Sequence, residues 1–186
     1  MKINGIYGVV AALVLSSPSA MAQSECQLTL SQPTVGFNTF RREDSVNTRQ
    51  QWHQMPTKEI SVNAYCPQDT VMGVFVQGSA GPQGRFLFGN GGGLAVRVSQ
   101  LVVDGRHYSV AKTSDRQNLT AEENAGETLL IHNNDGIVAV ENHAQVSGKQ
   151  MSFTLTLTPV LNDNQFSHTT DVTSLEADLR WELLTR

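Results

Sequence analysis

The residues of this chain that are best suited to chemistry are its two cysteines, Cys26 and Cys66. In a reducing compartment a pair of thiols indicates metal binding or redox chemistry, whereas in an oxidising compartment it usually forms one disulfide. A functional redox pair more often has C-x-x-C spacing, which is absent here. The choice between these interpretations therefore depends on whether the protein is exported.

The N-terminal residues predict export. Residues 1–22 have the pattern of a secretory signal peptide, with Lys2 at a positively charged start, an apolar run from Ile6 to Leu15 and the A-x-A cleavage site Ala20-Met21-Ala22. The apolar run is too short for a transmembrane helix, which needs about 20 residues. We therefore expect an exported, soluble protein whose mature chain begins at Gln23.

Export makes a structural disulfide between Cys26 and Cys66 the expected state of the two thiols. This bridge would close a loop of about 40 residues, which the chain-entropy model associates with roughly 3 to 4 kcal/mol of stability.

The remaining residues predict no catalytic centre, no metal site and no cofactor. No G-x-S-x-G sequence marks a serine nucleophile, and the glycine-rich stretch Phe88–Gly93 lacks the lysine and hydroxyl of a phosphate-binding loop. The histidines do not have the spacing that places two imidazoles on one face for a metal, and we expect them at the surface or at strand edges. They are His53, His107, His132, His143 and His168.

Composition and charge are those of one ordinary domain, which we expect to span residues 23–186. A chain of 186 residues with 39% hydrophobic content can bury a single core after removal of the signal. Its formal net charge of -4 at pH 7 argues against binding to nucleic acid or to an anionic membrane surface, because both need a basic face.

Apolar residues recur mainly with a period of two, which is typical of half-buried strands. The alternating runs are Leu28–Leu30, Ile60–Ala64, Leu94–Val98, Phe153–Leu157 and Leu175–Leu183. Turn signals at Asp104-Gly105 and Asn133–Gly136 predict two hairpins. Ala121–Ala125 could form one short turn of helix. The pattern predicts an all-β fold, an antiparallel β-sandwich.

In order and spacing, these segments resemble the subunits of chaperone-usher fimbriae, the pili of Gram-negative bacteria. Cys26–Phe37 is similar to the first pilin strand, and Ile60–Cys66 is similar to the second strand with its partner cysteine. Gly92–Val98, followed by Val103-Asp104-Gly105, resembles the middle hairpin of the family. Phe153–Pro159 resembles the strand before the C-terminal one.

The resemblance implies an immunoglobulin-like sandwich that lacks its last strand. A periplasmic pilus chaperone would fill the resulting groove first, and the N-terminal extension of another fimbrial subunit would replace it, with the outer-membrane usher as a further partner. The mature protein would pass through the periplasm to the fimbrium at the cell surface. The alternating residues that border the groove would be Leu175, Ala177, Leu179, Trp181 and Leu183.

The chain differs from the family pattern near both ends. Pilins carry a donor extension of ten or more residues before the first cysteine, whereas Gln23-Ser24-Glu25 would reach only about 10 Å. This subunit would accept a donor strand but scarcely give one, which favours a tip or minor subunit. Thr173 and Thr185 stand near positions where the family often has glycine and tyrosine, so the chaperone class stays open.

The polar stretch from Arg41 to Thr57 is long for a connection in a compact β domain. An aromatic side chain beside mixed charges could contact a host glycan or a host protein, and the candidate contact residues are Arg41, Arg42, Trp52 and His53. Alternatively, Trp52 packs beneath its own loop and the charges are only solvated.

We therefore expect a noncatalytic fimbrial subunit that takes part in cell adhesion and is assembled by strand complementation. The alternative is a freestanding secreted β-sandwich that binds a ligand such as a carbohydrate, closes its own sheet and does not polymerise.

Overall fold

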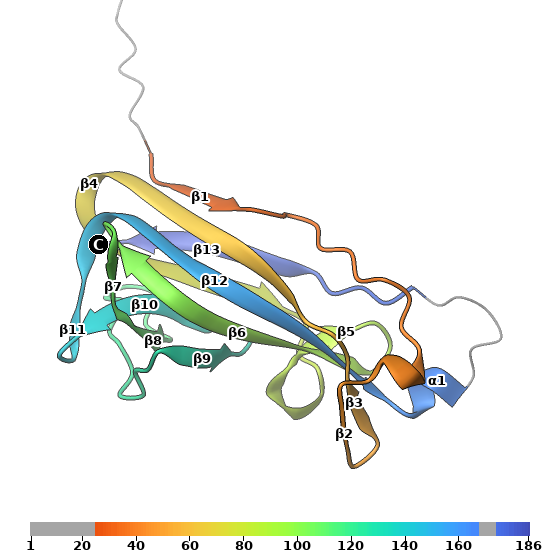
Figure 1. The fold of residues 1–186 in the computed structure, drawn as a ribbon. Helices are drawn as coiled ribbons and strands as arrows, with labels where there is room; N and C mark the ends of the chain where they lie inside the picture. The colour runs from red at the N-terminus through yellow and green to blue at the C-terminus, as the bar shows by residue number, and fades with distance from the viewer. Residues whose placement is uncertain (1–24, 168–173) are drawn as a thin grey trace, which may run out of the picture.

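The computed structural model describes residues 25–167 and 174–186 as a mostly antiparallel β-sandwich (Figure 1). The prediction of an all-β sandwich is therefore confirmed. The predicted signal peptide, residues 1–22, lies outside the described residues, as does His168.

Strand β4 (Lys58–Gly78) organises the fold, because its two halves belong to different parts of the sandwich. In the first half, Ile60, Val62 and Ala64 are buried and alternate with exposed neighbours, as expected for a strand with one solvated face. The second half is buried almost continuously from Gly73 to Val76, because side chains cover both of its faces. One long strand thus connects the two layers.

The first layer contains β1 (Gln27–Leu30), the first half of β4, β12 (Ser147–Asn162) and β6 (Gly92–Val103), in that order. Three short strands follow one another along the outer edge of β6: β5 (Phe86–Phe88), β9 (Thr128–Ile131) and β7 (Arg106–His107). The hairpin of β2 (Asn47–Arg49) and β3 (Trp52–Gln54) extends this layer, because β3 pairs with the far end of β12.

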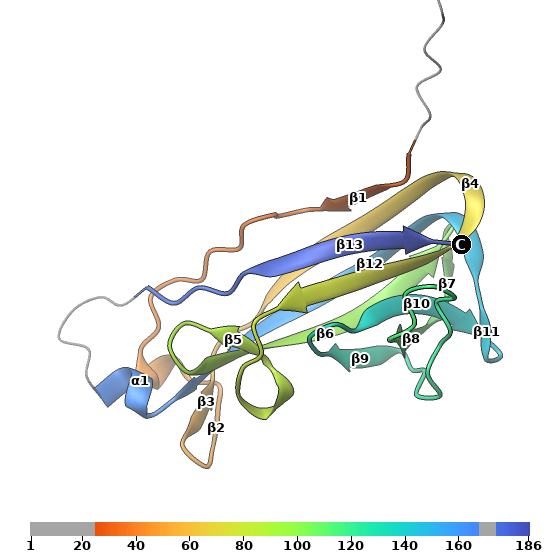
Figure 2. The ribbon, with the colours of Figure 1, turned by 180° about the vertical axis from the view of Figure 1, so that it is seen from behind.

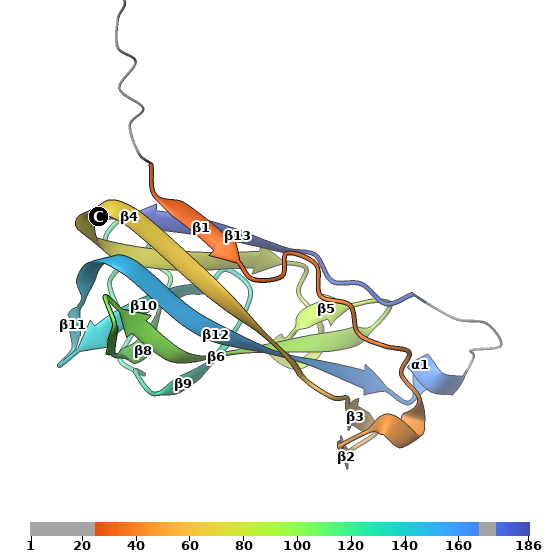
Figure 3. The same cartoon turned by 45° about the horizontal axis from the view of Figure 1, so that its top comes forward.

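The second layer is built on the other half of β4. Strand β13 (Leu179–Thr185) pairs with one edge of it, and β10 (Gly136–Glu141) pairs with the other. Beyond β10 lie β8 (Ser109–Thr113) and the short β11 (Ala144–Gln145). Figure 3 shows the two layers with β1 and β13 near each other on the same side of the molecule.

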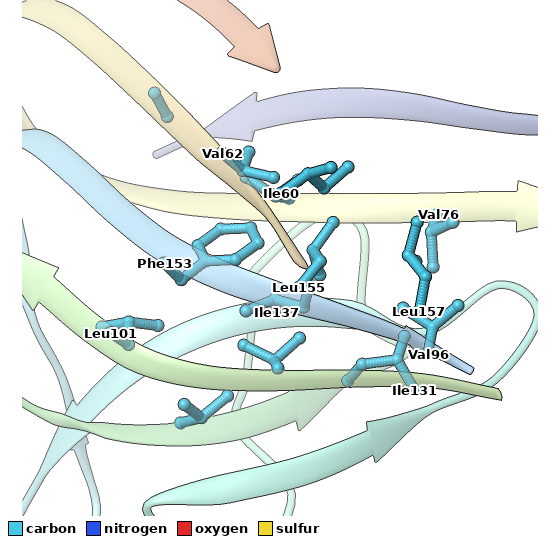
Figure 4. Packing of buried hydrophobic residues seen from close by; sticks show 14 of the residues in the cluster. Ile60, Val62, Val76, Val96, Leu101, Ile131, Ile137, Phe153, Leu155 and Leu157 are labelled. Atoms are coloured by element: carbon cyan, nitrogen blue, oxygen red, sulfur yellow. The ribbon is translucent and has the colours of Figure 1, made fainter. Parts of the chain in front are cut away.

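Apolar side chains from both layers form the core. In Figure 4, Phe153, Leu155 and Leu157 of β12 lie among Ile60 and Val96, which come from the neighbouring strands. Leu155 and Val96 are fully inaccessible to solvent. Each such side chain stabilises the fold by about 1.5 to 3 kcal/mol when it leaves water completely.

Helical structure in the described residues is limited to short pieces. These are α1 (Asn164–Ser167) and the 3-10 turns η1 (Arg42–Asp44) and η2 (Pro82–Gly84). The helical turn predicted at Ala121–Ala125 is wrong, because this segment is irregular. Backbone hydrogen bonds from Glu122 N to Lys112 O and from Gly126 N to Val110 O hold it along β8 instead.

One of the two predicted hairpins is confirmed. Asp104 and Gly105, with φ angles of 47° and 82°, form a two-residue turn that pairs β7 with the end of β6. Such turns need positive φ at both central residues, which Asp-Gly allows.

The hairpin predicted around Asn133–Gly136 is wrong, because β9 and β10 do not pair with each other. Strand β9 pairs with β6 in the first layer, whereas β10 pairs with β4 and β8 in the second. Asn134 N donates to Val76 O, and Gly78 N donates to Asn133 Oδ1, so the turn is bound to β4. It therefore carries the chain from one layer to the other.

The predicted disulfide is confirmed. Cys26 and Cys66 are bonded, with their Cα atoms 4.3 Å apart. The bridge continues the register of the adjacent β1–β4 ladder, in which Gln27 lies opposite Tyr65. It therefore fastens the start of β1 to β4.

Candidate functional site

A groove of about 950 Å³, with an apolar floor and walls of mixed polarity, lies between the segment that follows β1 and the segment that leads into β13. Figure 2 shows these two segments running along the same side of the sandwich. Their side chains form the walls, and core residues of the first layer form the floor. The residues that line the groove are Leu30, Gln32–Phe40, Ile60, Phe88, Leu94, Leu157, Leu161, Gln165, Phe166, Ser174–Leu179 and Trp181.

The N-terminal wall carries backbone groups that are free to pair. Ladder bonding of this part of the chain ends with Ser31 N, which donates to Ser61 O. Pro33 follows, and proline has no N–H to give to a ladder. Within the described part of the chain, residues 32–40 make no backbone–backbone hydrogen bond. This wall is an extended segment that lies beside the sandwich without belonging to a sheet.

The C-terminal wall is a sheet edge. Strand β13 pairs with β4 through one edge, and none of the described strands pairs with its other edge. Before β13, Glu176 O accepts a hydrogen bond from Gly89 N, so this segment is held near the β5–β6 turn. A row of unpaired backbone N–H and C=O groups on an edge strand is a template for pairing with another chain.

The floor of the groove is apolar and partly aromatic. Phe88 is 4% exposed, and the rings of Phe37 and Phe40 lie with their centroids 5.9 Å and 6.5 Å from its ring. Both arrangements are close to edge-to-face, which aromatic rings favour over direct face-to-face stacking. Leu94 and Leu157 extend this floor toward the centre of the sandwich.

Four of the five residues predicted to border the groove line it, namely Leu175, Ala177, Leu179 and Trp181. The fifth, Leu183, lies outside the lining but is half-buried and packs against the core. The alternation is also present, because Glu176, Asp178 and Arg180 are exposed.

The predicted strand over Leu175–Leu183 starts later than expected, at Leu179. The reason is that β4 ends at Gly78, opposite Leu179, so residues 174–178 have no continuing ladder beside them. They remain extended without strand pairing.

A buried side-chain donor near one end of the groove lacks an acceptor. Gln165 Oε1 accepts a hydrogen bond from Asn162 N at 2.9 Å, which fixes the orientation of the amide. Gln165 Nε2 is then buried and has no hydrogen-bond partner among the described residues. An unpaired buried donor costs about 1 to 3 kcal/mol. An oxygen acceptor supplied by a bound molecule would remove this cost.

The four residues predicted as a receptor-contact loop do not form one surface. His53 is 6% exposed, so the expectation of a surface histidine is wrong here. Its Nε2 lies 2.7 Å from Asp163 Oδ1, and its Nδ1 lies 3.1 Å from Thr48 Oγ1. Sequence could not reveal this burial, because Asp163 is 110 residues away along the chain.

Of the other three residues, Arg42 shares Asp163 with His53, whereas Arg41 and Trp52 make separate contacts. Arg42 pairs with Asp163 at 3.2 Å between Nη2 and Oδ1. Arg41 is exposed, and its backbone N–H donates to Asp44 Oδ2. Trp52 alternates with His53 along β3 and therefore faces the opposite side of the hairpin, where it lies beside Arg85. Trp52 lines a concave surface there.

Two classes of site are absent from the residues that the structure describes. No group of three or more His, Cys, Asp or Glu side chains in residues 25–167 and 174–186 could hold a metal ion. Among the same residues, no helix has the length and apolar character needed to cross a membrane.

The fold and the groove together define an all-β sandwich in which the unpaired edge of β13 lies beside a hollow with an apolar floor. No protein-family model, curated protein or solved structure matches the chain.

Proposed function

We propose that this protein is an exported, noncatalytic subunit of a chaperone-usher type fimbria and that its groove accepts an extended strand from a partner protein. One observation carries the proposal. An apolar floor lies between two walls whose backbone N–H and C=O groups are free to form hydrogen bonds with an added strand. In strand addition, main-chain hydrogen bonds hold the guest strand and pockets for alternate side chains select it. The groove offers unpaired backbone groups on its walls and an apolar floor for the inward side chains of a guest.

A guest strand would complete the sandwich by joining its two edges. One edge of the guest would pair with β13, and the other would pair with residues 32–40 or with β1. Its inward side chains would pack toward Phe88, Leu94 and Leu157, which have little exposed surface left, and would bury the half-exposed wall residues Leu175, Ala177 and Leu179. The guests in this proposal are first a periplasmic pilus chaperone and then the extension of another fimbrial subunit, with assembly at the outer-membrane usher.

The lining defines the chemistry of the guest. Among the described residues of the lining, the side chains with formal charge are those of Glu176 and Asp178, both exposed on the C-terminal wall. A guest with apolar residues at alternate positions and with lysine or arginine at outward positions fits this wall best. A carbonyl or side-chain oxygen at the α1 end would accept the hydrogen bond that Gln165 Nε2 can donate.

The short segment between the predicted cleavage site and Cys26 supports a place at the tip or at another minor position in the fimbrium. A subunit with a groove and no donor strand would end a chain of subunits. The fimbrium would then carry this protein on the surface of a Gram-negative cell, where adhesion to a host molecule takes place.

Thermal unfolding of the disulfide-bonded mature chain tests the proposal. We expect a clear rise in Tm when a fimbrial chaperone or a donor peptide from a fimbrial subunit is added, because a ligand that binds only the folded state stabilises it. The matched control is a peptide of the same composition in which the alternation is scrambled. The proposal would be refuted if neither the donor peptide nor the chaperone raised the Tm. It would also be refuted if the donor peptide and the scrambled peptide raised the Tm equally.

One observation favours the freestanding binding module as a second candidate. Phe37 and Phe40 already cover Phe88, so a segment of the chain itself shields part of the floor. A protein of this kind would be stable alone and would show no change of Tm with donor peptides.

A further inference from the structure

A second hollow, separate from the groove, lies between the β2–β3 hairpin and the loop that leads into β5. Its volume is about 310 Å³, at the small end of the range for ligand pockets. Figures 1 and 2 show the hairpin and this loop next to each other at the same end of the sandwich. The lining residues, referred to below as the Trp52 pocket, are Asn47, Arg49, Gln50, Trp52, Gln54, Gln83, Arg85 and Val160.

The Trp52 pocket has a composition unlike that of the groove. It combines one indole ring, two arginines and four side-chain amides, and its lining contains no carboxylate. No ion pair links Arg49 or Arg85 to an acidic residue among those that the structure describes. The pocket is therefore locally positive in a protein whose net charge is negative.

Arg85 is the central cation of the pocket. Its Nη1 donates to Gln83 Oε1 at 2.6 Å, and its guanidinium carbon lies 5.9 Å from the centroid of the Trp52 ring. The side chain is half-buried, and this desolvation lowers the pKa of the guanidinium, which still stays charged. A partly desolvated guanidinium with donors to spare and no acidic partner is suited to bind an anion.

The backbone around the pocket is held in an uncommon conformation on both sides. Gln50 and Gln51 at the tip of the hairpin have φ angles of 50° and 67°, and Gln83 on the facing loop has a φ angle of 56°. The two-residue turn between β2 and β3 needs positive φ at Gln50 and Gln51, and Gln83 lies in the η2 turn. These turns set the positions of two of the amide side chains that line the pocket, those of Gln50 and Gln83.

The two walls of the pocket are also anchored. The hydrogen bonds of buried His53 attach the hairpin to β12 through Asp163. On the other side, the chain passes very close to β5 at Gly81, where a Cβ atom would lie only 2.7 Å from Phe86 O. The site is consequently formed before any ligand arrives, which reduces the entropic cost of binding.

We infer that the Trp52 pocket binds a carboxylated sugar, the acidic residue of a glycan. Arg85, with Arg49 beside it, pairs with the carboxylate, and the neighbouring indole contacts the apolar face of the sugar ring. The four amides supply both donors and acceptors for sugar hydroxyls. A neutral sugar would leave the two arginines without a partner, and a simple anion would leave the amides and the indole unused.

Titration with sialyllactose and lactose, followed by NMR of the indole N–H signals, tests this inference. The Trp52→Phe variant assigns the Trp52 signal and distinguishes it from that of Trp181 in the groove. We expect sialyllactose to shift the Trp52 signal and to bind at least about tenfold more tightly than lactose, because only sialyllactose offers a carboxylate to the guanidinium groups. The inference does not depend on strand acceptance by the groove, and no donor peptide is present.

Three arginine variants identify the groups responsible. Arg85→Gln should weaken sialyllactose binding by about tenfold or more, and Arg49→Gln, at an exposed residue, should weaken it by a few-fold. Arg97→Gln is the matched control, because Arg97 is exposed on β6 outside the pocket. Equal affinity for sialyllactose and lactose would overturn the inference. The inference would also be overturned if inorganic phosphate bound as tightly as sialyllactose, or if no sugar shifted the Trp52 signal. A third contrary result would be an equal loss of sialyllactose affinity in all three variants.

Discussion

The sharpest test of the groove is the removal of Leu179 side-chain atoms. Leu179 is the first residue of β13 and is half-buried, with its Cδ2 packed over Gly78. Leucine-to-alanine changes at fully buried sites cost about 2 to 5 kcal/mol. For a half-buried leucine we therefore expect Leu179→Ala to lower the free energy of unfolding of the free protein by about 1 to 2 kcal/mol.

A bound guest strand would bury the rest of this side chain. The cost of Leu179→Ala should then rise by about another 1 to 2 kcal/mol in the complex, which corresponds to roughly 5-fold to 30-fold weaker binding of the guest. Arg180→Ala is the matched control, because Arg180 is next to Leu179 in β13 and its side chain is exposed on the opposite face of the strand. We expect it to change either quantity by less than about 0.5 kcal/mol.

Urea unfolding of the disulfide-bonded protein measures the first quantity, and calorimetric titration with a donor peptide measures the second. If Leu179→Ala destabilised the free protein but left the affinity for the peptide unchanged, the side chain would not face the guest. If the two variants weakened binding equally, the groove would not be where the guest lies. Either result would refute the reasoning.

Three further predictions concern stability. Replacing both Cys26 and Cys66 by serine should lower the free energy of unfolding by roughly 3 to 4 kcal/mol in urea, and a loss below about 1 kcal/mol would contradict the loop-closure argument. Asp163→Ala removes the acceptor of a buried histidine and should cost about 1 to 3 kcal/mol, measured in the same way, whereas an unchanged midpoint would show that this hydrogen bond is not needed. A backbone hydrogen bond from Asn118, with further hydrogen bonds nearby, lowers the pKa of Asp115 from 3.8 to about 2. Its ionised form therefore stabilises the fold above the unfolded-state pKa, and this contribution is lost as the pH falls through about 2. The test is urea unfolding of Asp115→Asn and of the original protein at a series of pH values. The free energy of unfolding of the variant should be lower at neutral pH and equal to that of the original protein at the most acidic pH. A constant difference at every pH would be evidence against this role.

The strands could be predicted because their signal is local. Leu28 and Leu30 alternate with polar residues, and this period of two is enough to predict a strand that has one buried face. The bounds of β13 could not be predicted in this way, because the same alternation begins at Leu175. Where the strand starts depends on where β4 stops, and that is a property of a segment far away in the sequence.

The two concave sites differ in how much of them the sequence could predict. The C-terminal wall of the groove was expected from the resemblance to pilins, which assigned the alternating residues Leu175–Leu183 to it. The N-terminal wall was not expected, because the same resemblance placed residues up to Phe37 in the first strand, whereas β1 ends at Leu30. The signal of this wall is Pro33 followed by Val35 and Phe37, in which a ladder-breaking residue precedes apolar ones. The Trp52 pocket needs Trp52 and Arg85 to meet, and their approach depends on the pairing of two separate strands with β12 and β6.

The double use of β4 has a consequence for the order in which the chain can fold. The residues of β13 come roughly a hundred residues after those with which they pair, and contacts of such separation form slowly. One edge of β4 therefore stays unpaired until β13 has formed. Until then the chain displays a hydrophobic edge that any extended apolar peptide could occupy. Strand β13 must therefore compete with other extended peptides for this edge of β4.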